Sequence, residues 1–160
     1  MSLKIGVMLE SFKCDVIEAI KKAAELGVDG VQFYGVSGEL DCDKLTDNKK
    51  NELKSLLIKH NLQVSAVCAD LGGYGFEIAE NNHSRIEKTC RVMDLAKEMD
   101  CSVVTTHIGV IPLYDCVKKQ TLSEACEKIG KYGEKIGVKL AIETGPVSYT
   151  HLTLPTKRIV

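Results

Sequence analysis

A glutamate ends an apolar run near the C-terminus of this 160-residue chain. Residues 138–142 (VKLAI) precede Glu143, and the strand-breaking sequence Thr-Gly-Pro follows it. This pattern is typical of a buried strand that stops at its last residue. A carboxylate there can bind a divalent metal ion or move a proton from a carbon next to a carbonyl group. Glu143 is therefore a candidate catalytic residue and metal ligand, with a solvated loop glutamate as the alternative.

A histidine ends a second apolar run, residues 103–107 (VVTTH), and Gly109 follows closely enough to let a ligand approach the backbone. An imidazole at this place can bind a metal ion or form a hydrogen bond with a sugar hydroxyl. His107 is thus a candidate for substrate binding and a second candidate metal ligand. The alternative is a histidine that only bonds to the rim of the fold.

Three further polar residues stand at or just beyond the ends of apolar runs: Glu10, Tyr34 and Asp70. Asp70 precedes a glycine-rich stretch, residues 72–75, which suggests a mobile loop over a pocket. Aspartate is also common as the first residue of a plain turn. We expect all three residues to bind substrate or to lie on the rim of its pocket.

The residues between these ends repeat a unit of one helix and one strand. Helical spacing of apolar residues predicts helices over residues 15–26, 46–60 and 84–99, and the sequence Thr121-Leu-Ser-Glu124 predicts a capping box that opens a fourth helix. The helices are expected to stop at residues that tolerate a positive φ, namely Gly27, Asn61, Asp100 and Gly137. Strands are expected over residues 4–9, 28–34, 62–68, 101–107 and 138–143.

This alternation predicts a parallel α/β fold with right-handed crossovers, whose strands are buried on both faces. One candidate is a (β/α)8 TIM barrel truncated after its fifth strand, because a whole barrel needs roughly 250 residues. The other is a complete, five-stranded doubly wound sheet, which the length favours and which would be a non-enzymatic ligand-binding domain. The polar residues at the strand ends favour the barrel, because a barrel gathers them around one mouth.

The composition of the chain indicates which classes of binding partner to expect. A net charge of −1 without a Lys/Arg cluster predicts no nucleic-acid or membrane partner. Seven scattered cysteines without a CxxC pair predict free thiols in a reducing, cytoplasmic environment. An incomplete barrel would expose two strand edges, so a homo-oligomer is a further expectation.

The chain changes character after Pro146. Residues 147–160 contain no Asp or Glu and no helical period, and they resemble a translated sequencing adapter or vector. We expect the domain to cover residues 1–146 and residues 147–160 to be a non-native tail, with an ordinary extended tail as the alternative.

Several phrases, in this order and spacing, resemble the xylose isomerase-like TIM barrel superfamily of sugar phosphate isomerases and epimerases. They are residues 24–33 (AELGVDGVQF), 104–109 (VTTHIG) and 140–145 (LAIETG), together with the first strand and Glu10. The resemblance covers residues 3–146, as an N-terminal fragment of such a barrel.

This resemblance implies a divalent metal ion (Mn²⁺, Mg²⁺, Co²⁺ or Zn²⁺) at the mouth of a (β/α)8 barrel. It implies isomerisation or epimerisation of a small sugar or sugar phosphate, with two metal-bound glutamates that exchange a proton. Glu143 matches the first of these glutamates. His107 matches a histidine of the fourth strand that contacts substrate in epimerase-like members and binds metal in the abasic-site endonuclease branch.

The sequence departs from the family pattern in two respects. The other metal ligands of the family come from strands six to eight, which lie beyond this chain, so the chain itself is expected to be inactive. The endonuclease branch, a metal-dependent hydrolase, also needs a histidine at the end of the third strand, where this sequence has Ala69 and Asp70.

Overall fold

The computed structural model describes residues 3–143. The expectation of a non-native tail at residues 147–160 lies outside the described residues. Strands and helices alternate along the described chain as β1 (Gly6–Met8), η1 (Leu9–Phe12), α1 (Val16–Glu25), β2 (Gly30–Tyr34), η2 (Gly38–Leu40), α2 (Asp47–Lys59), β3 (Gln63–Cys68), α3 (Ala79–Glu98), β4 (Val103–His107), α4 (Val117–Ile136) and β5 (Lys139–Glu143). The 3-10 helices η1 and η2 are short segments in the connections after β1 and β2.

The ends of the four α-helices follow the sequence prediction. Gly27, Asn61, Asp100 and Gly137 all have positive φ, at 71°, 55°, 57° and 80°. This left-handed conformation reverses the chain, so that each helix leads directly into the next strand. The four predicted helix stops are therefore confirmed.

Two predicted helix starts are wrong. Helix α3 begins at Ala79 instead of residue 84, and α4 begins at Val117, ahead of the predicted capping box. The Thr121 hydroxyl donates to the Val117 carbonyl oxygen at 3.0 Å, one turn back within α4. Glu124 accepts from the Gln120 side chain. Both side chains therefore form hydrogen bonds within α4 and do not cap its N-terminus.

The order of the strands decides between the two predicted folds. All neighbours are parallel, and the spatial order β1-β2-β3-β4-β5 equals the chain order. A doubly wound sheet reverses its strand order partway along the chain, so the expected alternative of a complete doubly wound domain is wrong. The described residues form the first five strands and four helices of a (β/α)8 barrel.

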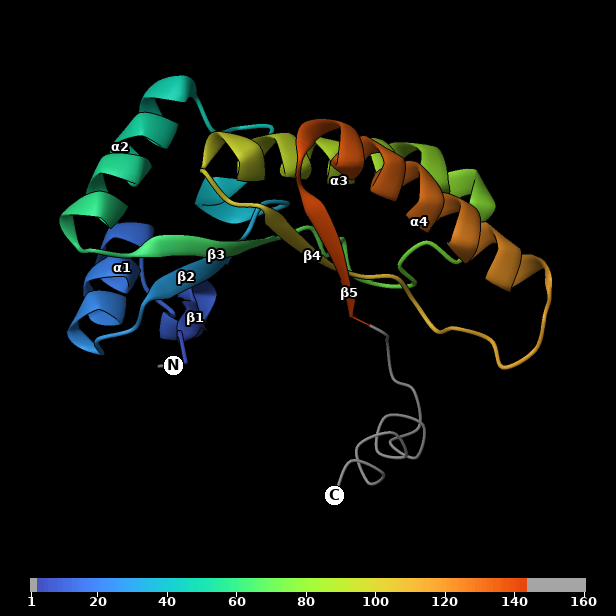
Figure 1. Cartoon of the computed structure of the whole chain (residues 1–160), viewed down its shortest axis with the longest axis horizontal. Coiled ribbons are helices and arrows are strands. Elements are labelled where there is room, and N and C mark those ends of the chain that lie inside the picture. The colour runs from blue at the N-terminus through green and yellow to red at the C-terminus, as the bar shows by residue number, and fades with distance from the viewer. Residues whose placement is uncertain (1–2, 144–160) are drawn as a thin grey trace, which may run out of the picture.

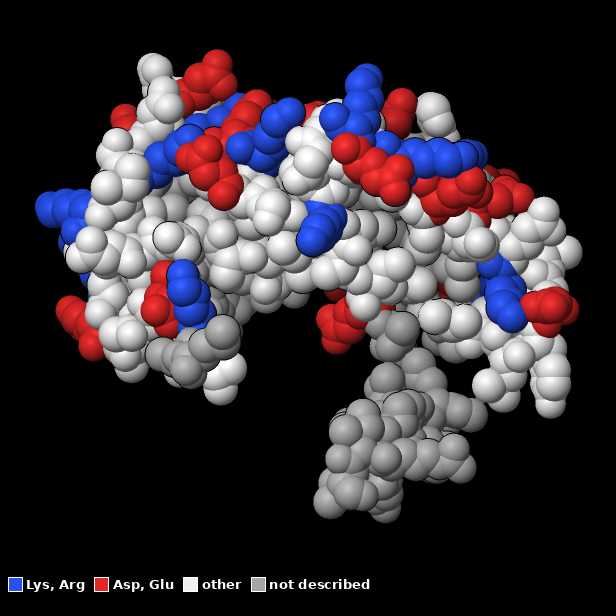
Figure 2. All heavy atoms as spheres, in the orientation of Figure 1, with Lys and Arg blue, Asp and Glu red and all other residues white. Residues whose placement is uncertain are grey.

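The sheet is curved, with the four α-helices on its convex side (Figure 1). Figure 2 shows the resulting arch: charged side chains gather along its helical outside, and its underside is hollowed. The core lies between the sheet and the helices. Its fully buried side chains include Val31, Phe33, Val67 and Val104 from the strands and Ile20, Met93 and Ile129 from the helices.

The prediction that the strands are buried on both faces is wrong for the concave face. In β2 and β4, buried residues alternate with partly exposed ones, because helices cover only the convex face. The departure is largest in β5, where Ala141, Ile142 and Glu143 are all exposed. Among the described elements β5 pairs only with β4, so it is an edge strand and not the buried strand that its sequence suggests.

Candidate active site at the carboxyl ends of the strands

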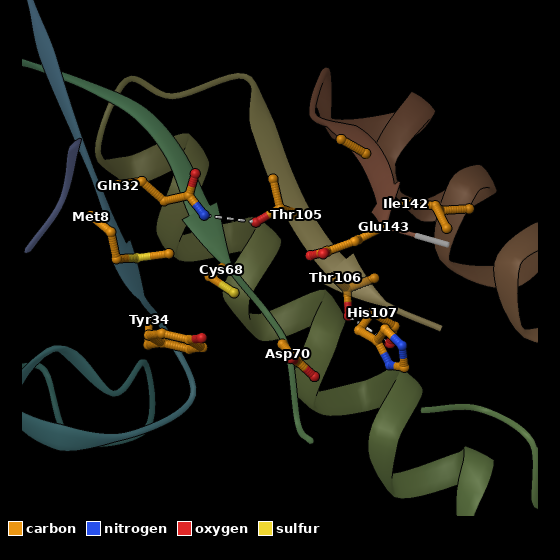
Figure 3. A pocket seen from close by; sticks show the side chains of 11 residues that line it. Met8, Gln32, Tyr34, Cys68, Asp70, Thr105, Thr106, His107, Ile142 and Glu143 are labelled. Carbon is orange, nitrogen blue, oxygen red and sulfur yellow. Dashed lines mark hydrogen bonds between the residues drawn. The ribbon is translucent and has the colours of Figure 1, made fainter. Parts of the chain in front are cut away.

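A hollow of about 340 Å³ opens on the concave face, at the carboxyl ends of the strands. Four of the five predicted site residues line it: Tyr34, Asp70, His107 and Glu143. Met8, Gln32, Cys68, Thr105, Thr106, Ala141 and Ile142 complete the lining (Figure 3). The barrel connectivity therefore brings together side chains that lie as far apart in the sequence as β1 and β5.

The pairing of β4 with β5 places the two candidate metal ligands side by side. His107 is the register partner of Glu143, and Thr105 is the partner of Ala141. Neighbouring strands lie about 4.8 Å apart, and residues paired in a parallel sheet point to the same face. An imidazole and a carboxylate thus stand on adjacent strand ends at one side of the hollow (Figure 3).

A second row of residues forms the floor of the hollow. Tyr34, Cys68, Thr105 and Ala141 are successive register partners across β2 to β5. The Gln32 side-chain amide crosses β3 and donates to the Thr105 hydroxyl at 3.2 Å (Figure 3). Gln32 and Thr105 therefore add polar groups to this floor.

Sequence reasoning missed Gln32 and Thr105 as lining residues. Each lies two residues before a predicted site residue, Tyr34 or His107, and so faces the same side of its strand. This two-residue spacing could have identified Gln32 and Thr105 as lining residues.

Glu10 contributes to the site from outside the hollow. Its carboxylate Oε1 accepts a hydrogen bond from the Tyr34 backbone N–H at 2.8 Å. The bond ties η1 to the end of β2 and so helps to place Tyr34. A direct contact between Glu10 and a substrate stays a prediction.

The electrostatic field at the end of β2 is negative. The charge of the neighbouring Cys68, burial, and then the charges of Asp70, Glu10 and Glu143 all raise the pKa of the Tyr34 phenol above its usual value. A site whose field opposes a new negative charge favours a cation. Of these groups, the carboxylates of Asp70, Glu10 and Glu143 are the ones that favour a cation near Tyr34.

Asp70 is the first residue of a turn, as the second interpretation of its sequence predicted. Its Oδ1 accepts from the Gly72 backbone N–H at 2.7 Å, and the Arg85 guanidinium donates to the Gly72 carbonyl oxygen at 2.7 Å. The same guanidinium lies over the ring of Tyr74, 5.0 Å from its centroid. These contacts connect the glycine-rich loop to α3, and Asp70 lines the hollow. The mobility of the loop stays a prediction.

A second acidic group lies in the connection between β2 and α2, and its negative charge is already neutralised by protein cations. The ligand atoms of Asp41, Cys42 and Asp43 lie within 4.8 Å of one another, a spacing that could hold a metal ion. However, Lys88 Nζ bonds to both carboxylates, at 2.7 Å for Asp43 Oδ2, and Arg91 Nε lies 2.7 Å from Asp43 Oδ1. Because two protein cations already hold these oxygens, this cluster does not fit a metal ion. Glu143 and His107 fit one better.

Three solved structures share this fold. A xylose isomerase domain protein from Planctomyces limnophilus has a TM-score of 0.72 and 19% identity, over 98% of this chain and 59% of that chain. A D-tagatose 3-epimerase-like protein has a TM-score of 0.72 and 20% identity, over 91% and 54%. A xylose isomerase-like TIM barrel protein from Mycobacterium smegmatis, solved with magnesium, has a TM-score of 0.66 and 14% identity, over 88% and 55%. The chain therefore spans between half and three fifths of their lengths.

No curated protein matches the sequence, and within residues 3–143 no helix is long and apolar enough to span a membrane. The sequence profile of one family, described as xylose isomerase-like TIM barrel, matches residues 20–155. The match covers most of the chain and agrees with the strand order and with the solved structures. The chain belongs to the xylose isomerase-like TIM barrel family.

Proposed function

We propose that this chain is the N-terminal part of a divalent-metal-dependent isomerase or epimerase that acts on a small sugar or sugar phosphate. The observation that carries the proposal is the pairing of His107 with Glu143 at the hollow, in a chain of this family. Among the similar structures, the epimerase-like protein supports this reaction class, and the magnesium complex supports a divalent metal ion.

Glu143, together with His107, would hold the metal ion (Mn²⁺, Mg²⁺, Co²⁺ or Zn²⁺). These donors fit such ions, because carboxylate oxygens suit hard divalent ions and imidazole suits borderline ones. Both side chains line the hollow, and the negative field around Tyr34 favours a cation there. A bound divalent ion would supply polarisation of a substrate carbonyl oxygen.

Glu143 would also carry the proton. A carboxylate next to a carbon that bears an acidified hydrogen can remove that hydrogen as a general base. Return of the proton to the neighbouring carbon gives isomerisation, and its return to the opposite face of the same carbon gives epimerisation. Epimerisation needs an acid that faces Glu143 across the substrate. We assign this acid to a part of the barrel outside residues 3–143.

The polar groups around the hollow would bind the hydroxyl groups of the substrate. Tyr34 and His107 can donate and accept hydrogen bonds, and Asp70 retains one carboxylate oxygen that is not used by its turn. Gln32 and Thr105 extend this polar surface to the floor. Polar side chains on a small concave surface match a polyhydroxylated ligand.

Solvent exchange on the natural protein that carries this chain tests the proposal. Incubation of a ketose with Mn²⁺ in D₂O should place deuterium on the carbon next to the carbonyl group. Glu143→Gln should abolish this exchange and leave the circular dichroism spectrum unchanged. Glu80→Ala, which removes an exposed carboxylate in the first turn of α3, is the matched control. Undiminished exchange by the Glu143→Gln protein would rule the mechanism out.

We propose a cytoplasmic location for the enzyme. All seven cysteines are free thiols, which is typical of proteins in reducing compartments. The proposal does not extend to a nucleic-acid substrate, because the residues at the end of β3 are Ala69 and Asp70 and provide no histidine.

A further inference from the structure

Glu77 connects the loop after β3, which carries Asp70, with the loop that follows His107 at the end of β4. It lies in the connection between β3 and α3, and its carboxylate faces the connection between β4 and α4. Glu77 Oε1 accepts from the Val110 backbone N–H at 2.6 Å, and Oε2 lies 2.5 Å from Lys118 Nζ. Only 17% of the Glu77 side chain is exposed, whereas its partners Val110 and Lys118 are 42% and 38% exposed.

The backbones of the two loops also interlock. The Phe76 N–H donates to the Ile108 carbonyl oxygen at 2.9 Å. A Cβ atom on Gly109, which has a φ of +103°, would lie 2.6 Å from Glu77 Cγ, and one on Gly75 would lie 2.2 Å from the Ile108 carbonyl carbon. The contact therefore requires glycine on both sides. Ile108 to Val110, the three residues after His107, are thus held against the neighbouring loop.

The Glu77 carboxylate is charged at neutral pH. Burial acts to raise the pKa of Glu77, but the hydrogen bonds from Lys118 and from the Val110 N–H outweigh burial and lower it. Hydrogen bonds to a charged acceptor are roughly twice as strong as those between neutral groups. The bond to Val110 is accordingly one of the stronger contacts that hold this loop.

We propose that Glu77 is a positioning residue for His107: it fixes the loop that begins at His107 through the Val110 N–H and does not itself touch a ligand. The consequence for catalysis rests on the proposed function, in which His107 contacts the metal ion or the substrate. The geometric part does not depend on it. The sequence did not predict a role for Glu77, because this role depends on two loops that meet only in the folded chain.

Amide hydrogen exchange at Val110 and the NMR signals of the His107 imidazole test the proposal on the full chain. In Glu77→Ala the exchange of the Val110 amide should quicken by about ten-fold or more, as expected for loss of a charge-assisted hydrogen bond, and the imidazole signals should shift. Glu77→Gln keeps an acceptor oxygen but loses the charge, so it should restore most of the Val110 protection and leave a smaller shift of the imidazole signals than Glu77→Ala does. Lys118→Gln removes only the ion pair and should resemble the wild type.

Two results would overturn the proposal. One is a Glu77→Ala protein with unchanged Val110 exchange and unchanged His107 signals. The other is a Glu77→Gln protein as strongly perturbed as Glu77→Ala. If Glu77→Ala does not fold, Glu77→Asp gives the same comparison with Glu77→Gln, because it keeps the charge but shortens the reach toward Val110.

Added Mn²⁺ separates this proposal from the proposed function. If the metal ion binds as proposed, its paramagnetism should broaden the signals of both Glu143 and His107. In Glu77→Ala the broadening at His107 should weaken while that at Glu143 persists, and equal broadening at both would count against a positioning role. If Mn²⁺ broadens neither residue in the wild type, the proposed metal site is wrong. The exchange and imidazole comparisons still decide the role of Glu77.

Discussion

Lys88 is a polar residue whose loss should destabilise the fold strongly. Its ammonium group bonds to Asp41 and Asp43, and the Lys88 and Asp41 side chains are only 13% and 10% exposed. These bonds tie the connection between β2 and α2 to α3.

Lys88→Met should destabilise the fold by roughly 3 kcal/mol, because it leaves a buried carboxylate without its partner. Lys44→Met is the matched control. Lys44 also faces Asp41, but at 3.8 Å and with 72% of its side chain exposed, so its loss should cost less than about 0.5 kcal/mol. Urea unfolding of the three proteins at neutral pH gives the comparison, and similar values for the two variants would contradict this account of Lys88.

The same contacts should make the loss depend on pH. The bonds from Arg91 and then Lys88 lower the pKa of Asp43 far below its usual value. Burial acts to raise the pKa of Asp41, but Lys88 and the Asp43 N–H lower it overall. A lowered carboxylate pKa contributes stability above the unfolded value near 3.9, and this stability is lost as the pH falls through the folded value. The difference between wild type and Lys88→Met should therefore shrink below about pH 4, and a difference that grows in acid would refute the assignment.

At the scale of single elements, α4 and its connection to β5 determine where Glu143 lies. The helix ends at Gly137, whose φ is +80°, and the N–H groups of Gly137 and Val138 donate to the Gly133 carbonyl oxygen at 2.8 and 2.9 Å. The strand begins only two residues later. Three glycines on this helix therefore have different roles that substitution can separate.

The three alanine variants of α4 should differ in sign. Gly130→Ala should stabilise the fold by up to about 1 kcal/mol, because a Cβ there meets no atom within 4 Å and alanine favours the helix. Gly137→Ala should destabilise it by about 1 kcal/mol through the left-handed φ. Gly133→Ala should also destabilise it, because its Cβ would lie 2.3 Å from the Val138 carbonyl oxygen. Thermal unfolding distinguishes these outcomes, and a destabilised Gly130→Ala protein would count against the packing described.

Local sequence signals predicted the parts of this fold that depend on local chemistry. The helix stops at Asn61 and Asp100 and the strand ends at Tyr34 and His107 follow from residue type and apolar spacing alone. One local signal failed. Thr121 has the sequence of a helix start, yet α4 begins one turn earlier.

The site residues that the sequence did not predict depend on contacts between distant segments of the chain. Gln32 and Thr105 form the floor because a residue of β2 reaches across β3 to β4, and the strand register that permits this is not encoded in either strand alone. Glu77 meets Val110 only because two loops interlock through Gly75 and Gly109. Composition and periodicity carry no information on such pairings.

At the scale of the whole molecule, the arch has two open flanks in its described part. Strands β1 and β5 are the edges of the sheet. Beside β5 a groove of about 540 Å³ runs between the strand and α4, and it is lined in part by Leu140 and Ile142. Ile142 is 41% exposed. An uncovered edge strand next to an apolar groove favours association with another chain.

We expect this chain to self-associate through the flank formed by β5 and α4. Ile142→Lys should weaken the association, because it places a charge at the edge strand. Ile58→Lys is the matched control, since Ile58 is 72% exposed on α2, away from β5. Sedimentation velocity at rising protein concentration measures the effect. A wild-type chain that stays monomeric throughout would contradict the expectation.

The central claim is that Glu143 and His107 together hold a divalent metal ion at the mouth of a barrel of this family. Titration of the full chain with Mn²⁺, followed by paramagnetic broadening of its NMR signals, tests the claim directly because it detects even weak binding. The account predicts broadening centred on Glu143 and His107 that disappears in Glu143→Gln. Broadening that is centred on Asp41 and Asp43, or that is unchanged by Glu143→Gln, would contradict it.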